Sequence, residues 1–180
     1  GPGRQILLPT GGGLDLGGIA KGWSVQQAVH RLRMWGPCLV DAGGDIACSG
    51  APPAGPWVVT VADPADAERD LAVLTLADEA VATSSRVKRQ WRHAGQAAHH
   101  LIDPRTGAPA ATNLLSVTAV APRLPDAEIH AKCALILGEH DGLAYLRAQP
   151  HVAALLVTDD GRHLISGRLE EKAYVSSQPF

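Results

Sequence analysis

The sequence has few aromatic residues, a nearly balanced charge and no long apolar run, and each of these shortages excludes a class of protein. Aromatic residues make up 4% of the 180 residues, so we expect no platform of stacked rings for single-stranded nucleic acid. The 16 basic and 18 acidic residues give a net charge of −2, which argues against nucleic acid or an anionic membrane as the main partner. No apolar run approaches the ~20 residues of a transmembrane segment.

Cysteine is also scarce. Cys38, Cys48 and Cys133 lie among apolar neighbours and show no C-x-x-C spacing. We therefore expect neither a zinc site nor a disulfide framework, and we predict three small buried thiols. A Cys38–Cys48 bridge across a hairpin, in an oxidising compartment, is the alternative.

The composition predicts one domain over residues 1–180. Hydrophobic residues make up 46% of the chain, which suffices for a core of this size. Residues 1–3 resemble a tag scar or a truncation, and the chain shows no signal peptide, so its compartment stays open. Residues 168–180 show no periodicity and are expected to form a mobile tail.

Strand and helix patterns come in mixed blocks without regular βαβ alternation, which predicts an α+β fold of mainly antiparallel sheet with packed helices. The expected strands cover residues 5–8, 38–40, 46–48, 57–61, 71–76, 80–84, 114–120, 152–157 and 163–166, and the expected helices cover 19–34, 125–137 and 141–148.

The densest group of titratable residues lies at 99–109. A strand that arrives through Leu101 and Ile102 must end at Asp103, because the following proline disfavours helical backbone and a glycine soon closes the bend. His100 and Asp103 would then be held on a loop, where chemistry is usually found. The alternative is a surface hairpin in which Asp103 only caps its own turn.

Two glycine pairs precede or join predicted elements. Gly17 and Gly18 lie ahead of the first helix, where backbone N–H groups favour an anion, and Lys21 is unfavourable in the first turn unless an anion neutralises it. This pattern predicts a phosphate near Lys21. The alternative is a glycine loop that only lets a helix and a strand pack closely. Gly43 and Gly44 predict a tight hairpin turn.

Two further patterns leave their roles open. Asp41 and Asp45 flank the Gly43–Gly44 turn, and their carboxylates could orient ribose or adenine donors or simply cap the turn. The strongly basic segment 86–93 is expected to be a solvated hairpin arm or a landing surface for an acidic partner segment.

Four segments in one order resemble the ApbE family of FAD:protein FMN transferases: 15–22, 41–45, 81–84 and 100–107. The likeness extends from about residue 14 to residue 138. It implies a magnesium-dependent enzyme that splits FAD and attaches FMN to a threonine or serine of a partner flavoprotein, while some relatives hydrolyse FAD to FMN and AMP. Members are often extracytoplasmic and membrane-anchored.

The resemblance also assigns expected roles. His100 is the expected general base, because imidazole titrates near neutrality, and Asp103 is expected to orient the catalytic loop. These residues should meet in one cleft with those expected to hold FAD, which are Asp15, Gly17, Gly18, Lys21, Gly43, Gly44, Asp45, Thr83, Leu101 and Ile102.

The expected metal site departs from the family pattern. The resemblance implies a magnesium ion held by Gly18 and by an aspartate and a threonine four residues apart, but aligning the apolar run and Gly138 places Glu128 and Lys132 there. Both positions share one helix face. A charged lysine has no lone pair for magnesium, so its ammonium could replace the metal charge, or only a non-catalytic flavin or nucleotide pocket remains. A shifted register would use Asp126 and His130 instead.

Overall fold

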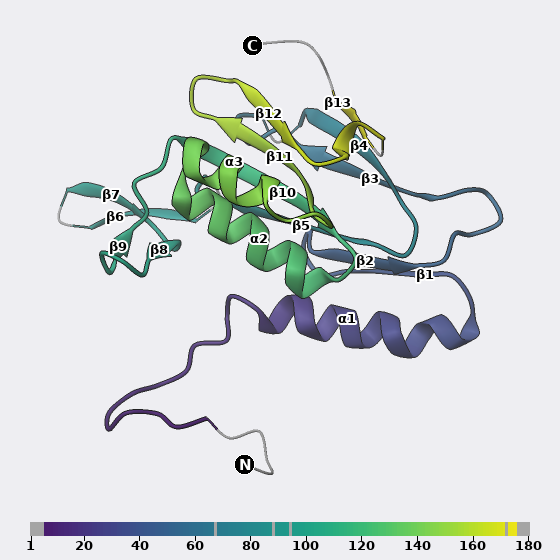
Figure 1. The fold of residues 1–180 in the computed structure, drawn as a ribbon, viewed down its shortest axis with the longest axis horizontal. Helices are drawn as coiled ribbons and strands as arrows, with labels where there is room; N and C mark the ends of the chain where they lie inside the picture. The colour runs from purple at the N-terminus through teal and green to yellow at the C-terminus, as the bar shows by residue number, and fades with distance from the viewer. Residues whose placement is uncertain (1–5, 67, 88, 94, 172, 176–180) are drawn as a thin grey trace.

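The computed structural model describes residues 6–66, 68–87, 89–93, 95–171 and 173–175 (Figure 1). Within these residues the largest sheet is antiparallel, with strand order β1-β2-β5-β10-β11-β12. A smaller sheet has the order β13-β4-β3. The strands span Cys38–Asp41 (β1), Ile46–Ser49 (β2), Trp57–Ala62 (β3), Asp70–Leu76 (β4), Ala80–Ser85 (β5), Leu114–Ala121 (β10), Ala153–Thr158 (β11), His163–Ser166 (β12) and Ala173–Val175 (β13). The predicted α+β class is confirmed.

Three α-helices cover one face of the main sheet in the part of the chain that the structure describes (Figure 1). Helix α1 (Ala20–Leu32) packs along β1 and β2, and α2 (Leu124–Leu137) packs over β5 and β10. Helix α3 (Glu139–Arg147) packs on α2. The predicted boundaries of α2 are nearly correct, because Pro125 favours the first turn and Gly138, at φ 83°, ends the helix.

The main sheet is buried on both faces, and successive residues of its central strands serve different cores. Ala82 of β5 and Ala119 of β10 pack with α2, whereas Val81 and Val120 pack with the smaller sheet. This alternation follows from the two-residue side-chain period of a strand. Because small residues face α2, the helix lies close against the sheet and both helix and strands can position side chains at their shared edge.

Two short hairpins lie together at one end of the main sheet (Figure 1). The first pairs β6 (Gln90–His93) with β7 (Gln96–His99), and the second pairs β8 (Ile102–Asp103) with β9 (Ala108–Pro109). His100 and Leu101 connect the two hairpins. The motif predicted to carry the chemistry is therefore built across this junction.

Two predictions about the ends of the chain are wrong. Residues 6–8 form no strand, and Leu7 is 96% exposed, because this segment pairs with no neighbouring strand; Gln5 lies outside the described residues. The predicted mobile tail instead packs through Leu169, which is 1% exposed, and pairs β13 with β4. Burial of a single leucine and a non-local strand pairing leave no periodic signal in the sequence. Residues 176–180 lie outside the described part.

The three cysteines are free thiols. Cys48 is buried as predicted, whereas Cys38 and Cys133 are only half-buried. The alternative Cys38–Cys48 bridge is wrong, because in the β1–β2 register Cys38 lies opposite Ser49 and Cys48 opposite Leu39. Among the described residues, no helix combines the length and the apolar character needed to cross a membrane.

Candidate functional site

The start of α1 meets α2 at two glycines whose missing side chains leave room for polar groups of α2. A Cβ atom on Gly18 would lie 2.7 Å from Lys132 Nζ, and one on Gly22 would lie 2.5 Å from Glu128 Oε2. Both separations are shorter than a real methyl group tolerates. A side chain at either position would therefore displace the end of the Lys132 or Glu128 side chain from its present place.

Glu128 and Lys132 lie one turn apart on α2 and point at the backbone around α1. The Gly22 N–H donates to Glu128 Oε2 at 3.1 Å, and Lys132 Nζ donates to the Gly18 carbonyl oxygen at 2.5 Å. The two side chains also pair with each other, with Nζ 3.7 Å from Oε1. Burial raises the pKa of the Glu128 carboxyl; the Lys132 charge opposes this shift, and Asp45 adds to it.

These contacts support the alignment that placed Glu128 and Lys132 toward Gly18. In the shifted register the candidates were Asp126 and His130, which have other neighbours. Asp126 pairs with Arg123 at 3.9 Å, and His130 Nδ1 lies 2.7 Å from the Tyr145 hydroxyl. The shifted register is therefore wrong for this cluster.

Lys21 connects the first turn of α1 to the β1–β2 hairpin. Its Nζ lies 2.7 Å from Asp45 Oδ2, and the carboxylate is buried while the lysine is 46% exposed. The anion that offsets Lys21 beside the helix N-terminus is thus a carboxylate of the protein, so the position of Lys21 does not by itself require a phosphate.

The two aspartates of the β1–β2 hairpin have different roles. Asp41 caps its own turn, accepting from the Gly44 N–H at 2.8 Å, whereas Asp45 reaches Lys21. Gly43 and Gly44 form the predicted turn, with positive φ values of 67° and 89°. A Cβ at either glycine would meet no atom within 4 Å, so their backbone borders open space beside the cluster.

His100 lies close enough to the cluster for the Lys132 charge to act on it. Burial is the main cause that lowers the pKa of His100, and the positive charges of Arg89 and Lys132 lower it further. A hydrogen bond to the backbone of Arg89 opposes the shift. The imidazole is thus held mostly neutral at neutral pH, with one ring nitrogen able to accept a proton.

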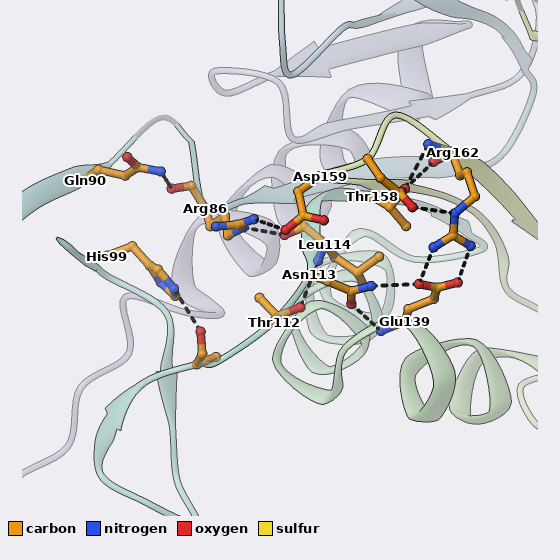
Figure 2. Close-up of polar contacts among 12 residues, drawn as sticks. Arg86, Gln90, His99, Thr112, Asn113, Leu114, Glu139, Thr158, Asp159 and Arg162 are labelled. Carbon is orange, nitrogen blue, oxygen red and sulfur yellow. Dashed lines mark hydrogen bonds and ion pairs between the residues drawn. The ribbon is translucent and has the colours of Figure 1, made fainter. Parts of the chain in front are cut away.

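The neighbouring His99 has a structural role. Its Nδ1 accepts from the Leu101 N–H at 3.3 Å, so its Nε2 carries the hydrogen that is donated to the Ala110 carbonyl at 3.1 Å (Figure 2). His99 is 9% exposed. Two adjacent histidines therefore differ sharply, since His99 is buried between two hairpins and His100 is exposed.

Asp103 holds the tip of the β8–β9 hairpin. Its carboxylate accepts from the Arg105 backbone N–H at 2.9 Å and pairs with the Arg105 guanidinium at 2.8 Å, and this contact lowers the pKa of the Asp103 carboxyl. Gly107 N–H donates to the Asp103 carbonyl at 2.8 Å. Asp103 thus caps its own turn, and a role in orienting the loop remains a prediction.

The remaining predicted FAD residues are not all brought to the cluster. Thr83 shares the sheet face of Val81, opposite α2, and its hydroxyl lies 2.8 Å from the Thr118 hydroxyl. Thr83 is exposed on that face, and its convergence with Lys21 stays a prediction. Asp15 caps its own loop by accepting from the Gly17 N–H at 2.7 Å.

Leu101 and Ile102 connect the cluster to the β8–β9 hairpin. The Leu101 backbone is engaged inside the fold, since its carbonyl accepts from the Ala110 N–H at 2.9 Å and its N–H donates to His99. Ile102 lies opposite Pro109 and is 45% exposed. Contacts between this backbone and FAD stay a prediction.

A second polar network lies at the starts of β10 and α3 (Figure 2). The Arg162 guanidinium binds both carboxylate oxygens of Glu139 at 2.6 and 2.9 Å, and the Asn113 side-chain amide donates to Glu139 at 2.7 Å. Arg86 pairs with Asp159 at 3.0 Å. At least one residue of the basic segment 86–93 therefore stabilises the fold rather than a partner surface.

The cluster does not fit a magnesium ion. Of the three expected ligands, Gly18 offers a carbonyl oxygen and Glu128 a carboxylate, but the Lys132 ammonium already donates to Gly18 and pairs with Glu128. Magnesium requires about six oxygen ligands in a regular octahedron. No group of three or more histidine, cysteine, aspartate or glutamate residues suited to a metal occurs in the described part of the chain.

Two contributors to the cluster escaped the sequence reasoning. Gly22 belongs to a recognised motif, but its N–H contact with Glu128 was not predicted. The available signal was its position inside a helix, where glycine lowers helix stability by about 1 kcal/mol relative to alanine. Arg89, whose charge lowers the pKa of His100, belongs to the basic segment, and nothing local distinguishes it from its neighbours.

The fold and the cluster together define an α+β protein in which two lysines and two carboxylates gather around the glycine-containing start of α1, with His100 near enough for the Lys132 charge to act on it. The ApbE family model matches residues 4–156. This match covers most of the chain, and the protein therefore belongs to the ApbE family.

Individual relatives agree with this assignment. A relative from Treponema pallidum named FAD:protein FMN transferase is 34% identical over 97% of this chain and 51% of its own length. The ApbE protein of Thermotoga maritima has a TM-score of 0.79 at 28% identity, and the flavin transferase ApbE of Vibrio cholerae has 0.72 at 30%. Each structural match covers 88% of this chain and 52% of the other. The chain thus spans about half the length of the relatives it matches.

Proposed function

We propose that this chain takes part in transferring the FMN moiety of FAD to a threonine or serine hydroxyl of a partner flavoprotein. The observation that carries the proposal is the cluster of Lys21, Asp45, Glu128 and Lys132 around the start of α1. His100 lies near enough for the Lys132 charge to lower its pKa. The names of the relatives from Treponema pallidum and Vibrio cholerae support the same activity.

In the proposed reaction the acceptor hydroxyl oxygen attacks the phosphorus of the FMN half of FAD. A phosphate ester forms, the bond between that phosphorus and the bridging oxygen breaks, and AMP leaves with the bridging oxygen. His100 accepts the hydroxyl proton, because its lowered pKa leaves a ring nitrogen unprotonated near neutrality. The ammonium groups of Lys21 and Lys132 supply positive charge beside the pyrophosphate.

The test is to incubate the chain with FAD and a candidate acceptor flavoprotein, then measure covalent flavin fluorescence in the denatured acceptor and AMP by chromatography. Fluorescent acceptor with an equal amount of AMP supports the proposal. FMN and AMP without labelled acceptor would indicate FAD pyrophosphatase activity instead. FAD binding without any cleavage would indicate a non-catalytic flavin-binding protein and would overturn the proposal.

A further inference from the structure

The Lys132 ammonium lies between the oxygen atoms that would otherwise bind a dissociable cation. It is 2.5 Å from the Gly18 carbonyl oxygen and 3.7 Å from Glu128 Oε1, and these two oxygens come from different segments of the chain. The other Glu128 oxygen accepts from the Gly22 N–H, so the carboxylate cannot rotate away without losing that bond. The ammonium is thus held from both sides.

The surroundings of Lys132 are shaped for this one position. Its side chain is 27% exposed and that of Glu128 is 9% exposed, so both groups are largely removed from water. A methyl group on Gly18 would lie 2.7 Å from the ammonium. The glycine therefore leaves the space that the lysine head occupies, which a lysine extended freely into solvent would not need.

We infer that Lys132 is a built-in cation that takes the place of a divalent metal, so that this chain binds its anionic ligand without magnesium. The identity of the ligand, the pyrophosphate of FAD, rests on the proposed function. A lysine ammonium has three donors and no lone pair, so it can bind Gly18, Glu128 and a phosphate oxygen but cannot ligate a metal. A divalent ion beside it would be repelled and would compete for the same carboxylate.

The first experiment titrates Mn²⁺, a spectroscopic probe for divalent-ion sites, into the ligand-free protein and follows free Mn²⁺ by electron paramagnetic resonance. The wild-type chain should bind Mn²⁺ weakly, and Lys132→Thr should bind it at least about tenfold more tightly. Lys132→Met is the matched control, because it removes the charge without adding an oxygen ligand and should gain less. Glu128→Gln in the Lys132→Thr background should abolish the gain.

Tight Mn²⁺ binding by the wild-type chain that survives Glu128→Gln would overturn the inference. So would equal Mn²⁺ affinities of the wild-type and Lys132→Thr proteins. Circular dichroism of every variant confirms that it is folded. Lys132→Arg keeps the charge, so it should bind Mn²⁺ as weakly as the wild-type chain, and it serves as the comparison if Lys132→Thr is unstable.

The second experiment measures FAD binding by fluorescence quenching in EDTA and in excess magnesium. The wild-type protein should bind FAD with the same affinity in both, whereas Lys132→Thr should require magnesium. A wild-type affinity that falls at least about tenfold in EDTA would overturn the inference. No FAD binding under either condition would contradict the proposed function, while the Mn²⁺ titration still decides the role of Lys132.

Discussion

Gly142 of α3 lies directly against the backbone of Ala134 in α2. A Cβ atom at residue 142 would overlap the Ala134 carbonyl group, whose carbon would lie 3.1 Å away. The contact involves backbone rather than a flexible side chain, so neither helix can relieve it by a change of rotamer. Glycine at this position lets α3 cross α2 at short distance.

We predict that Gly142→Ala lowers the free energy of unfolding by about 1–3 kcal/mol through overpacking. Helix propensity alone would favour alanine by about 1 kcal/mol, so the sign of the change distinguishes the two effects. Urea denaturation measures it. Ala144→Gly, at an exposed position of the same helix, is the control and should cost about 1 kcal/mol from propensity alone. Stabilisation by Gly142→Ala would show that the helices can move apart.

The ion pair between Lys21 and Asp45 should contribute to stability through the buried carboxylate. Lys21→Met leaves Asp45 buried without this cation, and we expect the free energy of unfolding to fall by about 1–2 kcal/mol. Adding Asp45→Asn should recover part of the loss, because no buried charge remains. Urea denaturation of the four proteins in this cycle gives the coupling. Additive effects would mean that the two side chains do not interact energetically.

The adjacent histidines should respond differently to substitution. His99→Leu removes the partner of the Leu101 N–H and the Ala110 carbonyl, and we expect a loss of about 1–3 kcal/mol in the free energy of unfolding. His100→Ala should change it by less than about 0.5 kcal/mol, while lowering flavin transfer roughly 10²–10⁴-fold. Thermal unfolding and the transfer assay test both; the reverse pattern would exchange the two roles.

The pH dependence of flavin transfer should report the protonation of His100. A protonated imidazole cannot accept the hydroxyl proton, so kcat/KM should fall as pH drops through the pKa of His100, which lies below its ordinary value of 6.5. Arg89→Gln removes one of the positive charges that lower this pKa but keeps the Arg89 backbone partner, so the acid limb should move toward higher pH. Coincident pH profiles of the two proteins would exclude His100 as the titrating group.

The Asp160 carboxylate should make stability sensitive to acid. Hydrogen bonds from Thr158 and Arg162 lower its pKa from 3.8 to about 2. A lowered acidic pKa adds stability above the unfolded-state value, and that stability is lost as pH falls from about 4 through about 2. The difference in free energy of unfolding between wild type and Asp160→Asn should therefore be constant above pH ~4 and shrink below it. A difference that does not change across this range would contradict the assignment.

The sequence allowed prediction of the elements whose signals are local. Pro125 and Gly138 define the ends of α2, and Gly43 and Gly44 define the β1–β2 turn, because each acts through its own backbone conformation. The pairing of β13 with β4 could not be predicted, since it joins distant segments.

The candidate site was predictable to the same degree. Glu128 and Lys132 were identified by aligning the apolar run and Gly138 with the family pattern, which places both on one helix face. The partner that neutralises Lys21 could not be identified, because Asp45 comes from a separate hairpin. The sheet face on which Thr83 lies could not be predicted either, since Val81 and Ala82 are both buried and the apolar pattern of β5 does not distinguish its two faces.

The placement of β10 between two cores has a consequence for cooperativity. Val117 belongs to the core beneath α2 and Val120 to the core beneath the smaller sheet, while β5 and β11 occupy both edges of the strand. Opening either layer would expose half of the β10 side chains. The two layers should therefore unfold as one unit, and the β10 amides should exchange with solvent deuterium only through global unfolding, later than those of the β6–β7 hairpin.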